Sequence, residues 1–530
     1  MTICKSSAMI KVPFKLEYLL LAAILILGLF LRLYKLDAVP AGFFADEASI
    51  GYNAFTILTQ GKDEHGIPHP IFFKAFGEYK NPLQIYSTVP FVALFGLNEF
   101  SVRLASVVYG VLGILALFLL VRELFPQQEG EMIALLSAFF LAISPWHIHI
   151  SRVALEGIAA FVFFTTLAVY FFLKSKNSPL YLLLSVITFT VSLYSYFPAR
   201  VFVPLLTLSL AFLYRRFFLK HRVHTMAGLF ILFLLIFPFF QALASPSGWA
   251  RWEQVSIFSQ PPASKTATQH IIKNYFSHFS PDFLFLKGDI GMPGSFITRH
   301  SVKGIGELYL FQLPLTLLGI VFIIKNKQKA TLFLLGVWLV LYPLGSAFTV
   351  DESARATRSI IGVIPWQILS AAGLFYLLTL FSKNFIKILL TFLLTVIIFL
   401  SFQIFLQKYF QDYPLYSSDY WGWQYGPKEI MGYFLSHKDN FDDLYLSGEF
   451  NAPEIFLKFY DPGGKCLNKC RIGNLTSYNP ARKQLFAVSS KDLSNSPLRN
   501  YFDIYQTIYY PNKNPAFYLG EIHPNNSLSL

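Results

Sequence analysis

Apolar residues dominate long stretches of the first four hundred positions, and polar residues fall in shorter segments between them. Many of these stretches approach the ~20 residues that a helix needs to cross a bilayer. They lie at 16–36, 101–121, 131–147, 157–173, 179–197, 200–214, 226–243, 306–324, 330–349, 359–380 and 385–406. The pattern predicts an all-α polytopic membrane domain over residues 1–406, with about 11 transmembrane helices.

The pattern changes after residue 406. Turn residues such as Asp461-Pro-Gly-Gly464 and short alternating stretches such as Leu444–Leu446 replace the apolar runs. This pattern is typical of short strands and helices joined by turns. We therefore expect a small α/β domain over residues 407–530. Within it, Cys466 and Cys470 are close enough for a local disulfide if the compartment is oxidising.

The composition excludes a water-soluble protein. Hydrophobic residues make up 54% of the chain and charged residues only 14%, whereas soluble chains are about 25% charged. The formal net charge of +13 does not indicate a nucleic-acid partner, because the basic residues form clusters between apolar runs and no continuous stripe. We expect membrane lipids around the chain and no nucleic acid.

The basic clusters predict the topology, because loops rich in Lys and Arg stay in the cytoplasm. The clusters are Lys5, Lys11 and Lys15; Arg122; Lys174 and Lys176; Arg215, Arg216, Lys220 and Arg222; Lys325, Lys327 and Lys329; and Lys383 and Lys387. All of them face the cytoplasm only if the ambiguous run 82–97 does not cross. We therefore expect 82–97 to lie in the interface or to be re-entrant.

This arrangement gives a multi-pass cell-membrane protein with a cytoplasmic N-terminus and interfacial helices in its first outer loop. The polar segments 37–81, 148–156, 244–305, 350–358 and 407–530 then share the outer face. The search for functional residues begins there.

The first outer loop carries adjacent carboxylates, Asp46 and Glu47. Adjacent helical residues point about 100° apart, so we expect separate roles, one as a base facing a cavity and the other holding it. The alternative is that Asp46 caps an interfacial helix that begins near Glu47, with both carboxylates at the positive end of the helix dipole.

Lys80 stands just before Asn81 and Pro82, a pair that suits the cap and first turn of a helix. A helix N-terminus with an ammonium beside it binds phosphate well. The alternative is a lysine that extends to lipid headgroups. The neighbouring Tyr79 is a candidate substrate contact.

The second outer loop contains Arg152 and Glu156, four residues apart and so expected on one helical face. An ion pair between them is the simple interpretation, although Arg before Glu is the poorer order. Ionisable groups at the edge of the hydrocarbon are also functional candidates. His147 and His149 are candidate substrate contacts, and we predict no metal site there because no third ligand follows at a suitable spacing.

Arg355 and Arg358 lie three residues apart near the outer end of a later predicted span. Two guanidinium groups can clamp a phosphate, and positive charge on the outer face needs an explanation. Pairing with Asp351 and Glu352 is the competing explanation.

In this order, the acidic pair, Glu78-Tyr-Lys-Asn-Pro82, Ser151-Arg-x-x-x-Glu156 and the late Arg pair resemble motifs of the GT-C glycosyltransferases. The resemblance is greatest to the protein O-mannosyltransferase and aminoarabinose-transferase group, glycosyltransferase family 39. It covers about 40–380 and is strongest over 43–156.

The resemblance implies a membrane enzyme that takes a sugar from a polyprenyl-phosphate donor and inverts at the anomeric carbon. The acceptor is a lipid, glycan or protein on the outer face. Asp46 matches the catalytic carboxylate, Lys80 a residue that contacts the lipid phosphate, and Arg152 a nearby basic residue. Glu156 matches a position often held by Asp, a departure that leaves its role open.

The chemistry agrees with these residue types. Displacement at the anomeric carbon needs a base and cations that stabilise the leaving phosphate. We therefore expect no cofactor, although metal assistance through Asp46 and Glu156 stays open. A flippase or transporter of lipid-linked saccharide is the rival function, but such proteins usually carry charges at mid-span and repeated halves. A polymerase or ligase with a diphosphate-linked donor also stays open.

Overall fold

A computed structural model describes residues 14–125, 127–244, 246–259, 266–289, 297–326, 328–351, 353–466 and 468–523. Among the residues considered above, Lys5, Lys11, Lys327 and Glu352 lie outside the described ranges.

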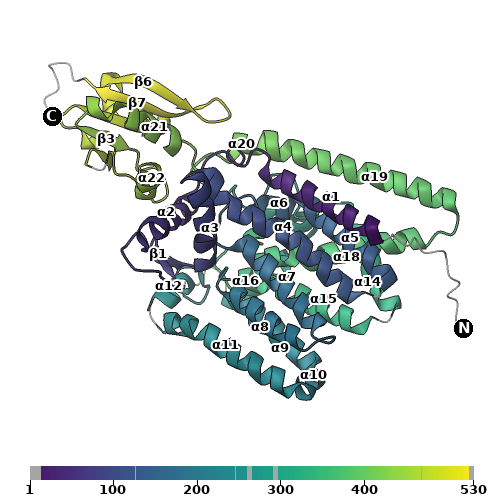
Figure 1. The fold of residues 1–530 in the computed structure, drawn as a ribbon. Coiled ribbons are helices and arrows are strands. Elements are labelled where there is room, and N and C mark those ends of the chain that lie inside the picture. The colour runs from purple at the N-terminus through teal and green to yellow at the C-terminus, as the bar shows by residue number, and fades with distance from the viewer. Residues whose placement is uncertain are drawn as a thin grey trace, which may run out of the picture.

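Helices dominate the first four hundred residues (Figure 1). The first half contains α1 (Phe14–Leu33), α2 (Ala45–Gln60), α3 (Pro82–Phe95), α4 (Glu99–Leu124), α5 (Gln127–Ile143), α6 (Pro145–Ile150), α7 (Ile158–Lys174), α8 (Leu180–Leu193), α9 (Ala199–Leu213), α10 (Arg215–Lys220) and α11 (Arg222–Leu243). The second half contains α12 (Pro246–Val255), α13 (Ala267–Ser277), α14 (Gln312–Lys325), α15 (Lys329–Leu341), α16 (Leu344–Ala347), α17 (Ala356–Ser359), α18 (Val363–Thr379) and α19 (Asn384–Gln407).

Every predicted span contains one of these helices. Among the described residues, six stretches are long and apolar enough to cross a membrane, and they include α1, α4, α11, α15, α18 and α19. Shorter helices, α5, α7, α8, α9 and α14, occupy the other predicted spans. The chain is therefore a polytopic membrane protein.

The ambiguous run 82–97 forms a separate helix, α3, of 14 residues. At 1.5 Å per residue its length is about 21 Å, less than the ~30 Å of hydrocarbon in a bilayer. Pro82 occupies the first turn and Gly96, with φ 75°, ends the helix, so local sequence sets both limits. Length does not separate α3 from the spans, because α8 and α14 also have 14 residues, so the non-crossing placement of 82–97 stays a prediction from the positive charges.

The first loop holds α2, α3 and a hairpin of β1 (Phe73–Ala75) and β2 (Glu78–Lys80). In Figure 1 these elements lie at the end of the helical bundle that faces the C-terminal domain. The hairpin and the start of α2 position two of the candidate residues, Lys80 and Asp46.

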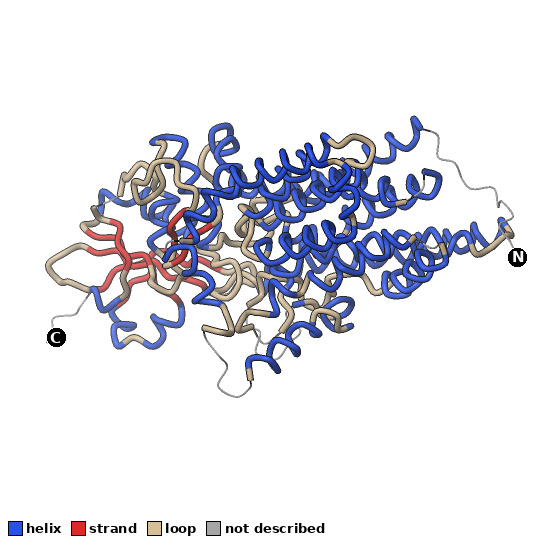
Figure 2. The backbone as a smooth tube through the Cα atoms, turned by 90° about the horizontal axis from the view of Figure 1, so that it is seen from below, coloured by secondary structure: helices blue, strands red, loops and turns tan. Residues whose placement is uncertain are grey.

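The C-terminal domain is built on a five-stranded mixed sheet with the order β4-β3-β5-β7-β6. Its strands are β3 (Asp443–Leu446), β4 (Cys470–Ile472), β5 (Gln484–Ser489), β6 (Phe502–Tyr509) and β7 (Pro515–Ile522). The strand β3 runs parallel to β4 and β5, and β7 is antiparallel to β5 and β6. Figure 2 shows the strands gathered at one end of the molecule and the long helices at the other.

The domain shares its core with the first loop. Helices α21 (Pro427–His437) and α22 (Glu454–Tyr460) bury Phe434 and Phe459 in one apolar cluster with Ile50 of α2. The Phe459 ring also packs against Phe43 in a tilted arrangement, with ring centroids 4.8 Å apart. The smaller helices α20 (Tyr413–Tyr416) and α23 (Ser490–Asn495) complete this part. The predicted disulfide between Cys466 and Cys470 is present.

Candidate active site

Asp46 and Lys80 form an ion pair at the end of the bundle next to the C-terminal domain. The Lys80 Nζ lies 2.9 Å from Asp46 Oδ1 and 3.2 Å from Glu78 Oε1. Lys80 is buried, whereas the Asp46 side chain is 25% exposed. Burial raises the pKa of Asp46, but the charge and hydrogen bond of Lys80, together with the charges of Arg299 and Arg251, outweigh burial and leave that pKa below its ordinary value. Asp46 is therefore ionised at neutral pH.

Glu47 has a different role from its neighbour. Its carboxylate accepts hydrogen bonds from Arg103 Nε and Nη2, both at 2.9 Å, and from the Ala154 N–H at 2.9 Å. It also accepts from the Phe44 N–H at 3.4 Å. The helix-capping function that we considered for Asp46 therefore belongs to Glu47. Because Glu47 is fully buried among these donors, it joins the first loop to α4 and to the second loop.

Arg152 and Glu156 do not share a helical face, so that expectation is wrong. The chain leaves α6 at Ile150, and Glu156 adopts φ 49° in a turn before α7. The Arg152 guanidinium donates to five carbonyl oxygens, those of Leu31, Arg32, Tyr34, Lys35 and Val39, at 2.7–3.1 Å. These contacts hold the end of α1 and the turn after it. Among the described residues, Arg152 forms no hydrogen bond or ion pair with Asp46 or Lys80.

Glu156 lies beside that pair. Burial raises the pKa of its carboxyl above the ordinary value, although the charges of Lys80 and Arg251 oppose the rise. In the part of the chain that the structure describes, its Oε2 has no hydrogen-bond partner. The two carboxylates therefore have opposite pKa shifts, Asp46 downward and Glu156 upward.

The two histidines make contacts inside the protein. His147 Nδ1 lies 2.7 Å from Arg32 Nη2, and His149 Nε2 lies 2.7 Å from the Arg299 carbonyl oxygen. Both are buried. Tyr79 is half-buried in β2, opposite Lys74. None of these three residues lines the pocket described next. Their role as substrate contacts stays a prediction.

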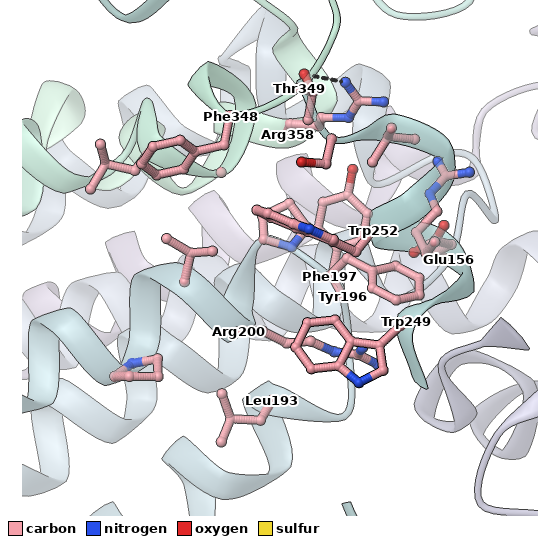
Figure 3. A pocket seen from close by; sticks show the side chains of 18 of the residues that line it. Glu156, Leu193, Tyr196, Phe197, Arg200, Trp249, Trp252, Phe348, Thr349 and Arg358 are labelled. Atoms are coloured by element: carbon pink, nitrogen blue, oxygen red, sulfur yellow. Dashed lines mark hydrogen bonds between the residues drawn. The ribbon is translucent and has the colours of Figure 1, made fainter. Parts of the chain in front are cut away.

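A pocket of about 420 Å³ opens beside Glu156. Its polar side chains include Arg200, Arg251 and Arg358, and aromatic rings form much of the rest (Figure 3). The lining residues are Glu156, Leu193, Tyr196, Phe197, Pro198, Arg200, Val201, Pro204, Ile236, Phe239, Phe240, Trp249, Arg251, Trp252, Val255, Ser256, Leu344, Gly345, Phe348, Thr349 and Arg358. Figure 3 shows the Trp249 ring beside Arg200 and the hydrogen bond between Arg358 and Thr349.

The arginines connect the pocket to the ion pair. Arg251 Nη1 lies 2.5 Å from Glu78 Oε2, and Glu78 in turn contacts Lys80. Arg200 Nη2 donates to Asn81 Oδ1 at 2.9 Å. Asn81 stands at the start of α3, but its side chain makes no capping hydrogen bond, so the expected cap is replaced by this contact. A continuous polar path therefore runs from Asp46 to the pocket.

Arg355 and Arg358 have different surroundings. Arg358 lines the pocket, forms an ion pair with Asp351 and donates to Thr349 at 2.8 Å. Arg355 pairs with Asp289 at 2.9 Å and with Asp351 at 3.1 Å, and it is not a lining residue of the pocket. Both arginines thus make the carboxylate contacts that we considered as the alternative, and only Arg358 also reaches the pocket.

The sequence analysis missed Arg200, Arg251 and the tryptophans beside them. Arg200 follows a turn between two predicted spans, and Arg251 lies in the predicted outer segment 244–305. Both are positive charges on the predicted outer side, the same signal that singled out Arg355 and Arg358. Their contacts with Asn81 and Glu78 depend on long-range folding and have no sequence signal.

No group of three or more His, Cys, Asp or Glu side chains suited to a metal ion occurs among the described residues. The ion pairs of this site instead use lysine and arginine.

Comparisons with known proteins agree with this architecture. A family model described as dolichyl-phosphate-mannose-protein mannosyltransferase matches residues 80–240. No curated protein matches the chain in sequence.

Two solved structures illustrate the fold, and a third gives a weaker match. ArnT from Cupriavidus metallidurans in the apo state matches with 13% identity and a TM-score of 0.54, over 96% of this chain and 99% of ArnT. An Archaeoglobus fulgidus oligosaccharyltransferase tethered to an acceptor peptide matches with 13% identity and a TM-score of 0.51, over 94% of this chain and 74% of that protein. ArnT bound to undecaprenyl phosphate matches with 15% identity and a TM-score of 0.45, over 68% of this chain and 60% of ArnT. The chain is therefore a membrane protein with the GT-C glycosyltransferase fold, as its sequence motifs predicted.

Proposed function

We propose that the protein transfers a sugar from a polyprenyl-phosphate donor to a lipid, glycan or protein acceptor, with inversion at the anomeric carbon. The observation that supports this most directly is the pocket, in which aromatic and aliphatic walls adjoin three arginines and Glu156. A lipid phosphate has the same two parts, an apolar chain and an anionic head. The family match and the fold support the same class of reaction.

In this proposal the donor phosphate binds near Arg200, Arg251 and Arg358. Lys80 is one contact further away, because it pairs with Glu78, which in turn pairs with Arg251. Guanidinium groups bind phosphate oxygens in a bidentate manner. The prenyl chain continues along a second apolar cavity of about 310 Å³ between α8, α9 and α11. The two cavities share Leu193, Pro204 and Ile236 as lining residues, so one chain can occupy both.

Asp46 is the proposed base. It is ionised, partly exposed and held by Lys80, so it can receive the acceptor proton as the hydroxyl oxygen attacks the anomeric carbon. The bond from that carbon to the phosphate oxygen breaks, and the cations stabilise the leaving phosphate. Glu156 is the second carboxylate and lies between the ion pair and the pocket. The reaction takes place on the outer side of the membrane if the predicted topology holds.

Mass analysis of glycolipids and glycoproteins from cells with and without the gene tests the proposal. We expect a hexose or pentose to be missing without the gene, and wild-type protein to restore it. Lys80→Ala should fail to restore it, whereas Lys74→Ala, which changes an exposed lysine of the same hairpin, should succeed. Identical glycan profiles with and without the gene would contradict the proposal. Vesicles in which the purified protein moves an uncleaved lipid-linked sugar across the membrane would favour the flippase instead.

A further inference from the structure

A third cavity, here called the junction cavity, lies between the turn after α1 and the start of the C-terminal domain. Its volume is about 550 Å³. The lining residues are Lys35, Asp37, Ala38, Val39, Ala41, Gly42, Phe43, Glu99, Pro414, Gln424, Tyr425, Gly426, Pro427, Lys428, Glu429, Tyr460 and Pro511. None of them lines the pocket beside Glu156 or the apolar cavity between α8, α9 and α11, so the junction cavity is separate from both.

Gln424 is the most informative residue of this cavity. Its side chain is buried, with a relative exposure of 1%. Within the described residues, neither its Nε2 nor its Oε1 has a hydrogen-bond partner. Buried amides are normally paired, because an unpaired one loses its hydrogen bonds to water without replacement. Among the described residues the amide thus has unused donors and an unused acceptor, and because both atoms are buried, a ligand in the cavity reaches them once the side chain turns toward it.

The remaining walls suit a neutral, hydroxyl-rich ligand. Glu99 already accepts from Lys428 at 3.0 Å and from the Tyr460 hydroxyl at 2.9 Å, so these charges are balanced and presented in fixed positions. Tyr425 and the prolines add flat apolar surfaces. Amide and carboxylate groups pair with hydroxyls, and aromatic faces pack against the C–H faces of a sugar ring. A hydrocarbon chain would leave these polar groups unpaired.

The junction cavity adjoins the loop that leads into α2 and Asp46. Its wall includes Gly42 and Phe43, which directly precede α2 and Asp46. A side chain at Gly42 would meet the Trp423 carbonyl oxygen at 2.4 Å, so the segment that carries Gln424 packs directly on this loop. Arg103 also binds the Gly42 carbonyl at 2.8 Å.

We propose that the junction cavity binds a sugar residue of the acceptor, at a distance from the hydroxyl that receives the new sugar. This assignment rests on the proposed glycosyltransferase function and narrows its acceptor to a molecule that already carries a saccharide. The C-terminal domain then contributes acceptor recognition through Gln424, while the membrane domain holds the donor.

Saturation-transfer NMR on the purified full-length protein tests the assignment without donor or turnover. The probes are free glucose, galactose, mannose, rhamnose and N-acetylglucosamine at millimolar concentration. Gln424→Gly removes the amide, and glycine adopts the observed φ of 55° without strain. Ala38→Trp fills the cavity from an exposed position. Gln506→Ala is the matched control, because Gln506 is an exposed glutamine on β6 of the same domain.

We expect at least one sugar to receive saturation from the wild type and from the Gln506→Ala protein. Transfer should fall about fivefold to tenfold in Gln424→Gly, as for loss of hydrogen bonds to a buried polar group, and should disappear in Ala38→Trp. Equal transfer from all four proteins, or transfer from the wild type to none of the sugars, would overturn the assignment. Transfer to a polar peptide but to no sugar would also overturn it. If the sugars bind as expected but the gene deletion leaves every glycan unchanged, the binding site stands and the glycosyltransferase proposal fails.

Discussion

At the scale of single residues, the surroundings of Lys80 distinguish between the two roles predicted for it from sequence. Burial lowers the pKa of Lys80, but Asp46 and Glu78 reverse this effect and raise that pKa above its ordinary value. The ammonium is therefore permanently charged. A lysine that reached lipid headgroups would be exposed, whereas Lys80 is 1% exposed, so the alternative that we considered from sequence does not fit.

Lys80→Ala should reduce donor use strongly in the folded fraction of the protein. We expect a loss of transition-state stabilisation of about 2–4 kcal/mol, as for removal of a group that stabilises developing charge. The measurement is kcat/KM for the polyprenyl-phosphate sugar with purified protein, with Lys74→Ala as the control. Turnover of Lys80→Ala equal to that of the control would remove Lys80 from the donor site.

The opposite pKa shifts of Asp46 and Glu156 predict which carboxyl shapes the pH profile. Asp46 has a lowered pKa, so it stays ionised until the pH falls below the ordinary pKa of an aspartate. Glu156 has a raised pKa, so it gains a proton at a higher pH than Asp46 does. We therefore expect Glu156→Gln to remove or shift the acidic limb of kcat/KM against pH. Asp46→Asn should lower the rate at every pH and move that limb to lower pH, because the Asp46 charge contributes to the raised pKa of Glu156.

Asp46→Asn also separates catalysis from structure, because Asn keeps the shape of Asp. A folded Asp46→Asn enzyme with nearly normal turnover would pass the role of base to Glu156. An acidic limb that disappears in Asp46→Asn but stays in Glu156→Gln would reverse the two assignments.

At the scale of elements, the Glu47–Arg103 pair joins α2, α4 and the second loop. Both side chains are completely buried, and Arg103 also binds the Leu36, Pro40 and Gly42 carbonyls. This geometry makes Glu47 a positioning residue for Asp46, although the sequence suggested it as a catalytic residue. The sequence showed the acidic pair but could not show which member faces inward, because Arg103 is 56 residues away.

Arg103→Met should lower the free energy of unfolding by about 3–5 kcal/mol, because it leaves the buried Glu47 charge without its partner. Thermal unfolding of the purified protein measures the loss. The double variant Glu47→Met/Arg103→Met should recover part of the stability, since it removes both charges. A double variant less stable than Arg103→Met would show that Glu47 is needed mainly for its contacts with Ala154 and Phe44.

The extent of sequence-based prediction also differs between elements. Each predicted span holds a helix, since apolar runs of this length have few other structures in a bilayer. The segment after α6 was predicted as helix from the spacing of Arg152 and Glu156, but carbonyl groups at the end of α1 bind Arg152 and the chain turns there. Spacing describes a helix only where the backbone is one, and these long-range contacts decide that it is not.

The Cys466–Cys470 disulfide constrains the segment before β4. Of the three cysteines, two are paired, so one thiol should titrate in the denatured, non-reduced protein. The closed loop is short, and the loop-entropy model gives a stabilisation of about 2 kcal/mol. Three titrated thiols would show that the bond does not form in the native compartment.

At the scale of the whole molecule, helix order and charge together predict the topology. The structure gathers Asp46, Lys80, Glu156, Arg251 and Arg358 from separate segments at one end of the bundle. The sequence had assigned all of these segments to one side, from helix count and the positive-inside bias alone. Their convergence supports the predicted alternation of the helices.

We expect the loop around Arg215–Arg222 to be cytoplasmic and the C-terminal domain to lie outside, because only this orientation keeps the basic clusters in the cytoplasm. Fusions of a cytoplasmically active reporter after residues 220 and 450 measure the two sides. Activity is expected at 220 and not at 450. The reverse result would leave the fold unchanged but would move the active site and the junction cavity into the cytoplasm. The donor would then have to present its sugar on the cytoplasmic face, and acceptors confined to the outer surface would be excluded.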